Sequence, residues 1–197
     1  MHSGLPSYDE LHALPMPPRM HPNGFIQLEL GSRKRRLHIW PETPMVTREV
    51  ETPIHDHIFG FDSEVLLGRL GHFIFDAEAD PAGPYHLYTA GCSAQGKVND
   101  HLVRIDDRRY RLEQTEAIWL DAGDTYRFEP FRFHESRHEG LTATIFQIHD
   151  FEETGATRIC CPIDQVPDNS AKKPFRRDGF DPEVLWAQIE RVYRLIS

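Results

Sequence analysis

The chain has 197 residues, a formal net charge of −9 and 39% hydrophobic residues. This length suits one domain with a sizeable core, and the acidic balance argues against nucleic acid or an anionic membrane surface as the main partner. No segment reaches the roughly 20 apolar residues of a membrane span, and the first residues lack the apolar core of a signal peptide. The three cysteines form no disulfide framework, because their number is odd. We therefore expect a cytoplasmic protein.

Residues 1–24 are rich in proline and predict an N-terminal arm that packs along the rest of the protein or along a neighbouring subunit. Ser7 and Glu10 have the spacing of a capping box, which predicts one short helix in this arm. An arm of this kind would suit a homodimer.

From Phe25 the sequence changes to many short strand-like segments separated by turns with no helix between them, which predicts a β-barrel or β-sandwich. The expected strands lie at 25–30, 36–40, 46–51, 63–76, 86–90, 101–105, 117–121, 124–129 and 142–149. The basic run Arg33–Arg36 falls between the first two, where we expect a solvated hairpin turn rather than a binding patch. The stretch Asp76–Asp100 contains several glycine and proline residues and predicts a loop over one barrel mouth, with a lid or substrate-contacting role left open.

His55 and His57 are spaced so that both point to the same side of a strand. Imidazole is the commonest protein donor to zinc, copper and iron. A third histidine from elsewhere in the chain would give three ligands on one side of a metal ion and leave coordination positions free for substrate. His134 is the third candidate, and it follows a predicted tight turn at Asp121–Asp124. A His-X-His triplet by itself is a weak signal in a chain with 12 histidines, so its position must carry the argument.

The positions of these residues resemble the two motifs of the cupin family. The first family motif reads His-X-His, three or four residues, Glu, six residues and Gly, and His55, His57 and Gly68 match its ends. The second motif begins with a glycine and leads to a further histidine, at the spacing of Gly123 and His134. The resemblance covers roughly residues 25–160. It implies an all-β, cupin-type double-stranded β-helix barrel, similar to a jelly roll.

The chain departs from the family motifs in ways that change the expected ligand set. Phe61 stands where the family has its glutamate, so the resemblance implies a three-histidine site without a fourth ligand. Asp62 and Glu64 are the nearby carboxylates, and we expect neither to be a ligand, because strand parity turns Glu64 to the opposite face and Asp62 would misplace the closing glycine. In the second motif, Glu129-Pro130-Phe131 replaces the family's Pro-X-Gly turn, which leaves the geometry of that loop open.

Three neutral imidazoles leave a divalent ion with its full charge and with open positions. Such sites resemble those of non-haem Fe(II) dioxygenases that act on thiols and related small molecules, and this is the function we expect, with a small-molecule substrate. A metal-assisted isomerase, epimerase or lyase that uses Zn, Mn or Ni is an alternative. A non-catalytic cupin that binds a small ligand is another.

Three more residues are candidates for catalytic roles. His138 follows His134 by four residues and would be a general base, a hydrogen-bond partner of a ligand, an alternative ligand or simply a histidine at the barrel mouth. Tyr126 and Arg127 are neighbours on a strand, so one of them is expected to face the pocket, where an arginine would suit a substrate carboxylate.

Residues 161–197 predict a C-terminal extension with a helix over 181–196. Asp181 is a suitable N-cap and Pro182 suits the first turn. An apolar face for docking on the barrel or on a partner subunit is formed by Leu185, Ile189, Val192, Tyr193 and Ile196. Cys160 and Cys161, just before this region, are expected to be two buried small residues at the end of a strand rather than a redox or metal site.

Overall fold

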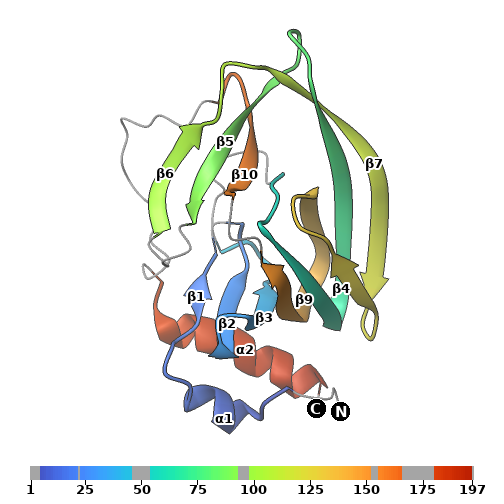
Figure 1. Cartoon of the computed structure of the whole chain (residues 1–197). Helices are drawn as coiled ribbons and strands as arrows, with labels where there is room; N and C mark the ends of the chain where they lie inside the picture. The colour runs from blue at the N-terminus through green and yellow to red at the C-terminus, as the bar shows by residue number, and fades with distance from the viewer. Residues whose placement is uncertain are drawn as a thin grey trace.

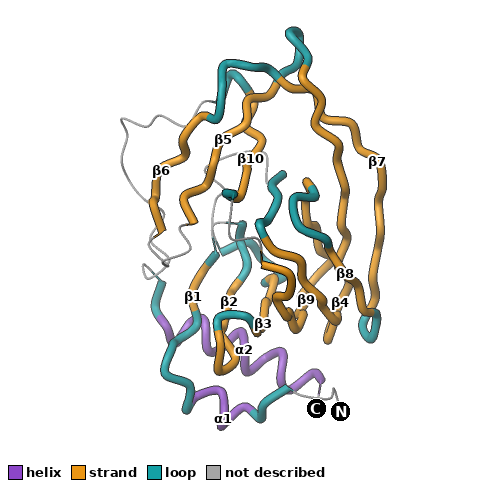
Figure 2. Tube along the Cα trace, in the orientation of Figure 1, coloured by secondary structure: helices purple, strands orange, loops and turns teal. Residues whose placement is uncertain are grey.

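The computed structural model describes residues 5–21, 23–45, 54–92, 98–151, 155–165 and 180–196, and the strand expected at 46–51 lies outside these ranges. Antiparallel β-strands dominate the described ranges, which confirms the predicted all-β class (Figures 1 and 2). The strands are β1 (Arg19–Met20), β2 (Ile26–Ser32), β3 (Arg35–Trp40), β4 (Phe59–Ala79), β5 (Tyr85–Cys92), β6 (Val98–Arg104), β7 (Tyr110–Asp121), β8 (Thr125–Phe128), β9 (Phe133–Phe151) and β10 (Thr157–Pro162). The helices are α1 (Tyr8–His12) and α2 (Pro182–Ile196).

The strands form one curled sheet in the order β1-β2-β3-β9-β4-β7-β5-β10, with β8 beside β4 and β6 beside β5. The two longest strands, β4 and β9, pair along most of their length. Their register shifts around Gly68, which has a φ of 76° and lies so close to the carbonyl of Leu141 that a Cβ atom would come within 2.4 Å of it. Gly68 therefore lies at a bulge that bends β4 without ending it.

A short segment, residues 54–57, closes the curled sheet between β9 and β10. The backbones of His55 and His134 exchange two hydrogen bonds, of 3.1 and 2.9 Å. On the other side, the N–H of Asp56 donates to the carbonyl of Arg158 and the N–H of Cys160 donates to the carbonyl of Ile54, both at 3.0 Å. Because β10 pairs with β5 and β5 pairs with the start of β7, strand pairing runs from β9 around the barrel and back to β9.

The two faces of the sheet carry different side chains because side chains alternate along each strand. On β3, Leu37 and Ile39 belong to the largest apolar cluster, which lies between the sheet and the helices. The alternate residues Arg36, His38 and Trp40 line a cavity on the inner face. The core therefore covers one face of these strands and leaves the inner face for a site.

Helix α2 crosses the outer face of β1, β2 and β3, and α1 lies beneath it (Figure 1). The carboxylate of Asp181 accepts a hydrogen bond of 3.0 Å from the N–H of Glu183, which confirms the predicted N-cap. The stripe residues Leu185, Ile189, Val192 and Tyr193 are buried. The capping box of Ser7 and Glu10 is also confirmed, and Tyr193 donates a hydrogen bond of 2.8 Å from its hydroxyl to the carbonyl of Pro6 in the arm. Neither helix in the described ranges is long and apolar enough to span a membrane.

The described part of the stretch Asp76–Asp100, which the sequence predicts to be a loop over the barrel mouth, is largely strand, and residues 93–97 lie outside the described ranges. Residues 76–79 continue β4, residues 80–84 make the turn, and β5 follows. Gly83 is required in this turn, because a Cβ atom there would lie 2.3 Å from the backbone of β7. The loop prediction was wrong because three of the residues that suggested it, at positions 81, 83 and 84, serve one tight turn.

Candidate metal centre

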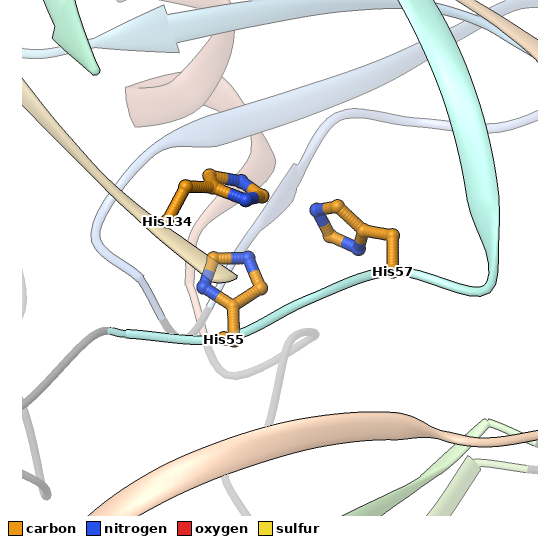
Figure 3. A group of neighbouring side chains, drawn as sticks. All are labelled: His55, His57 and His134. Carbon is orange, nitrogen blue, oxygen red and sulfur yellow. The ribbon is translucent and has the colours of Figure 1, made fainter. Parts of the chain in front are cut away.

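Three histidine side chains, His55, His57 and His134, meet inside the curled sheet (Figure 3). Two of them come from the closing segment 54–57, and the third comes from the start of β9. Their ligand nitrogen atoms all lie within 4.8 Å of one another, which is close enough for one metal ion to gather them. The fold thus brings together the three histidines that the sequence motifs single out.

The hydrogen bonding of His134 suits a metal ligand. Its Nδ1 lies 3.0 Å from the carbonyl oxygen of Arg132. A carbonyl oxygen can only accept, so Nδ1 carries the proton and Nε2 holds the lone pair. The backbone therefore fixes both the tautomer and the orientation of the ring, as is typical of ligating histidines.

Burial keeps these rings in the form that binds metal. It lowers the pKa of His57 and the pKa of His134 well below the usual 6.5, and the neighbouring His55 adds to both shifts. Both rings are neutral at pH 7 and can donate a lone pair.

A buried ion pair holds the segment that carries His55 and His57. The carboxylate of Asp56, which lies between them in the sequence, has no exposed surface. It accepts hydrogen bonds of 2.6 Å from the backbone N–H and the Nε of Arg158, and the Nη2 of the same residue is also 2.6 Å away. The guanidinium of Arg158 also lies 4.6 Å from the ring centre of Phe133, the residue before the third histidine. Arg158 therefore contacts both segments that carry candidate ligands.

The loop before His134 has a left-handed residue where the family has its glycine. Phe131 stands there with a φ of 60°, a conformation that costs a residue with a side chain about 1–2 kcal/mol. Its N–H donates a hydrogen bond of 2.7 Å to the carbonyl of His57. The loop whose geometry the sequence leaves open is thus a strained turn that is fastened to the closing segment.

The three histidines line a cavity of about 80 Å³. In all, six histidines line it: His21, His38, His55, His57, His72 and His134. Six larger aromatic side chains line it as well: Phe25, Trp40, Phe59, Phe61, Tyr126 and Phe146. In the described part of the chain, no carboxylate contributes to this wall, and Arg36 is its one permanently charged residue.

Phe61, at the position of the family's glutamate, is part of the cavity wall. Its ring stacks on Phe128 at 5.2 Å between centroids and lies 6.3 Å from the ring of His134. Asp62 is exposed, and Glu64 is not part of the wall. An aromatic ring therefore stands where the cupin motif has its glutamate, and the candidate donor set consists of three imidazoles.

The three candidate catalytic residues lie in different places. Tyr126 lines the cavity, its hydroxyl is hydrogen-bonded to Ser63, and burial raises its pKa. Arg127 is exposed and forms ion pairs with three acidic side chains. His138 lies outside the cavity wall, with its Nδ1 2.9 Å from the carbonyl of Gly140. Of the two neighbours on β8, Tyr126 is the one that faces the cavity.

Sequence reasoning missed the part of the wall that β3 and the second half of β4 supply. Arg36 belongs to the basic run expected to form only a solvated turn, yet it lines the cavity with His38 and Trp40. His72 on β4 is 2% exposed, and its Nδ1 is 3.1 Å from the hydroxyl of Ser136. The available signal on β3 was a polar or aromatic residue at every second position, with aliphatic residues between them.

The fold and the site together define an all-β, curled barrel-like sheet with a candidate three-histidine metal centre. No family model matches the sequence, and no curated protein matches it either. Among solved structures, the chain is similar to hydroquinone 1,2-dioxygenase from Sphingomonas sp. TTNP3 with 4-hydroxybenzoate bound. That similarity has a TM-score of 0.30 and 12% identity and covers 59% of this chain and 60% of that chain. The chain is also similar to protein NMB1881 from Neisseria meningitidis, with a TM-score of 0.32 and 8% identity, over 74% of this chain and 99% of that chain. The chain thus spans about 60% of the length of the dioxygenase, and similarities this distant carry no argument about activity.

Proposed function

We propose that the protein is a non-haem Fe(II) dioxygenase of the cupin type that acts on a small molecule, with His55, His57 and His134 as the metal ligands. The observation that carries this proposal is the meeting of the three imidazoles within 4.8 Å of one another on the wall of a cavity. The fixed tautomer of His134 and the neutral state of the buried rings support metal binding.

The chemistry of the donor set suits a divalent metal ion that acts as a Lewis acid. Three neutral donors with no carboxylate do not compensate the charge of a divalent ion and leave coordination positions open. When bound, Fe(II) would supply a redox-active centre at which substrate and dioxygen can meet. Phe61 and the other aromatic side chains make a large part of the cavity wall apolar. Tyr126 contributes its ring to this wall, because its hydroxyl is hydrogen-bonded to Ser63.

The test is metal analysis combined with oxygen consumption. Protein purified without chelators and loaded anaerobically with Fe(II) is expected to hold about one iron per chain and to consume dioxygen with at least one compound in a panel of small thiols and phenols. His57→Ala and His134→Ala are expected to lose the iron and the activity. His12→Ala, a change on α1 away from the cavity, is the matched control and is expected to keep both.

A protein that binds iron but never consumes dioxygen would contradict the dioxygenase proposal and favour a metal-assisted isomerase, epimerase or lyase. One observation favours this second candidate. His72 lies beside His134, with 6.1 Å between ring centroids, and its Nδ1 is 3.1 Å from the hydroxyl of Ser136, so a further neutral imidazole stands beside the three candidate ligands. If the protein holds no stoichiometric metal and His57→Ala leaves its ligand binding unchanged, both enzyme proposals fail.

A further inference from the structure

The candidate metal ligands differ in what holds their rings. The ring of His134 is fixed through its Nδ1 by the carbonyl of Arg132. The ring nitrogens of His57 make no hydrogen bond to any residue in the described ranges. A histidine that binds a metal almost always donates its second ring N–H to a partner, because that bond fixes the orientation of the ring. His57 therefore needs another means of orientation.

The electrostatic surroundings of His57 agree with this description. Burial is the largest cause that lowers its pKa, and the charges of three other histidines and of Arg36 lower it further. A carboxylate beside the ring would raise the pKa instead, because it favours the charged imidazolium. The partner that a carboxylate supplies to the histidines of many metal sites is therefore not found at His57 among the described residues.

The side chain that lies flat against His57 is Phe59. Side chains alternate along an extended chain, so residues 55, 57, 59 and 61 share one side of it, and all four line the cavity. The rings of His57 and Phe59 have 4.7 Å between their centroids and are only 14° from parallel. Phe61 lies nearly perpendicular to the same imidazole, at 5.9 Å and 77°. Phe59 is therefore the ring that sets the plane of His57, whose imidazole points toward the other two candidate ligands (Figure 3).

Phe59 is itself held by the strand that carries the third candidate ligand. Its ring stands nearly perpendicular to that of Phe146, with 6.3 Å between the centroids and 86° between the planes. Phe146 is buried and belongs to β9, the strand that begins at the residue before His134. Phe59 therefore connects His57 of the closing segment to β9 through two aromatic contacts.

The stack affects metal binding as well as ring position. A metal ion draws electron density from the imidazole that binds it, so this ring becomes partly positive. The face of a phenyl ring is negative, because its π-system carries a quadrupole, and it attracts positive charge that lies over it. Phe59 therefore stabilises His57 more strongly when a metal is bound than when it is absent.

We infer that Phe59 is a positioning residue of the metal centre and orients His57 by aromatic stacking in place of a hydrogen bond. This inference rests on the proposed function for the identity of the ligands, and it adds the side chain that holds one of them. It concerns metal affinity and ligand geometry, which zinc and cobalt report without iron, substrate or dioxygen.

Zinc titration of Phe59→Leu tests this role. Leucine keeps an apolar side chain but removes the ring face, so the dissociation constant for zinc is expected to rise about fivefold. Phe25→Leu is the matched control, because Phe25 lines the same cavity and stacks on His21 at 4.2 Å and 9°, and His21 is not one of the three candidate ligands. The control is expected to bind zinc within twofold of the unchanged protein.

Pentafluorophenylalanine at position 59 separates the electrostatics of the stack from simple packing. It has nearly the shape of phenylalanine, but fluorine reverses the sign of the ring quadrupole, so its face repels positive charge. The dissociation constant for zinc is expected to rise at least as much as in Phe59→Leu. The visible spectrum of the cobalt-loaded protein, which depends on ligand geometry, is expected to change in both proteins altered at position 59 and not in Phe25→Leu.

Zinc binding in Phe59→Leu within twofold of the unchanged protein, or an equal loss in Phe25→Leu, would overturn the inference. Unchanged zinc binding with pentafluorophenylalanine would also overturn it, because Phe59 would then serve packing alone. This analogue keeps the volume of the ring, so it decides the question if Phe59→Leu does not fold. An unchanged protein that takes up no zinc would refute both proposals, whereas iron uptake without oxygen consumption would refute only the dioxygenase.

Discussion

Asp56 is the residue whose surroundings do most to fix the candidate metal centre, although it is not a ligand. Its side chain is fully buried, whereas that of Arg158 is 33% exposed. A buried carboxylate requires a partner, and here the partner is a guanidinium from another strand. The position of His55 and His57 therefore depends on the contact between Asp56 and Arg158, which lie about 100 positions apart in the chain.

Arg158→Gln tests this dependence. Removing one partner leaves Asp56 buried and unpaired, so the free energy of unfolding is expected to fall by about 3 kcal/mol. The dissociation constant for zinc is expected to rise about tenfold or more, as is typical when a group that orients metal ligands is lost. Urea unfolding and zinc titration measure the two effects.

Arg127→Gln is the matched control for Arg158→Gln. Its ion pairs are exposed and screened by solvent, so stability is expected to change by less than about 1 kcal/mol and zinc binding not at all. If both variants lose equal stability, or if zinc binding in Arg158→Gln is unchanged, Arg158 does not hold the segment that carries His55 and His57 in place.

Phe131 offers a second test at the scale of one residue. Phe131→Gly and Phe131→Ala lose the same ring, but only alanine keeps the penalty of a positive φ. The glycine variant is therefore expected to be the more stable of the two by about 1 kcal/mol in urea unfolding. At the neighbouring Arg132, which has no positive φ, the alanine variant is expected to be the more stable one. If the alanine variant were the more stable one at position 131 as well, Phe131 would not be strained.

At the scale of elements, strand type and facing follow from local pattern, but strand ends do not. The helical stripe of α2 predicted its buried face, and the motif spacing predicted which three histidines meet. The sequence predicted shorter strands, 63–76 where β4 runs from Phe59 to Ala79 and 117–121 where β7 begins at Tyr110. These ends depend on pairing between distant strands, which stabilises residues such as Asp76 and Glu78 in a conformation that their own propensities do not favour.

The docking of α2 is tested by two alanine variants on the same helix. Ile189 is completely buried in the largest apolar cluster, so Ile189→Ala is expected to lower the free energy of unfolding by about 2–4 kcal/mol. Leu195 is 60% exposed, and Leu195→Ala is expected to cost less than about 0.5 kcal/mol. Since both changes remove a large aliphatic side chain from α2, similar losses in urea unfolding would mean that the helix does not dock through Ile189.

At the scale of the whole molecule, the candidate metal ligands were predictable and most of their surroundings were not. The ligands follow a spacing along the chain, whereas the cavity arises when β3 pairs with β9 and the sheet curls. That pairing brings His38 beside Phe146, residues that no local pattern relates. A buried histidine and a surface histidine look alike in sequence until the register between distant strands is known.

The buried histidines give the metal-free molecule a characteristic response to acid. Burial lowers the pKa of His38, His57 and His134 well below 6.5, and lowers the pKa of His72 to about 3. Well above pH 6.5 these rings are neutral in both the folded and the unfolded states, so they give no pH dependence there. Below pH 6.5 the unfolded chain takes up protons that the folded protein does not, so stability falls as the pH falls.

The expected slope is up to about 1.4 kcal/mol per pH unit for each of these histidines between pH 6.5 and pH 5. Urea unfolding of the metal-free protein at several pH values measures it. In His38→Phe the ring that titrates in the unfolded chain is gone, so the slope is expected to be smaller by up to about 1.4 kcal/mol per pH unit. If the stability of the metal-free protein stays constant from pH 7 to pH 5, the inner wall is not held neutral by burial, and the same rings would then be protonated competitors of any metal at mildly acidic pH.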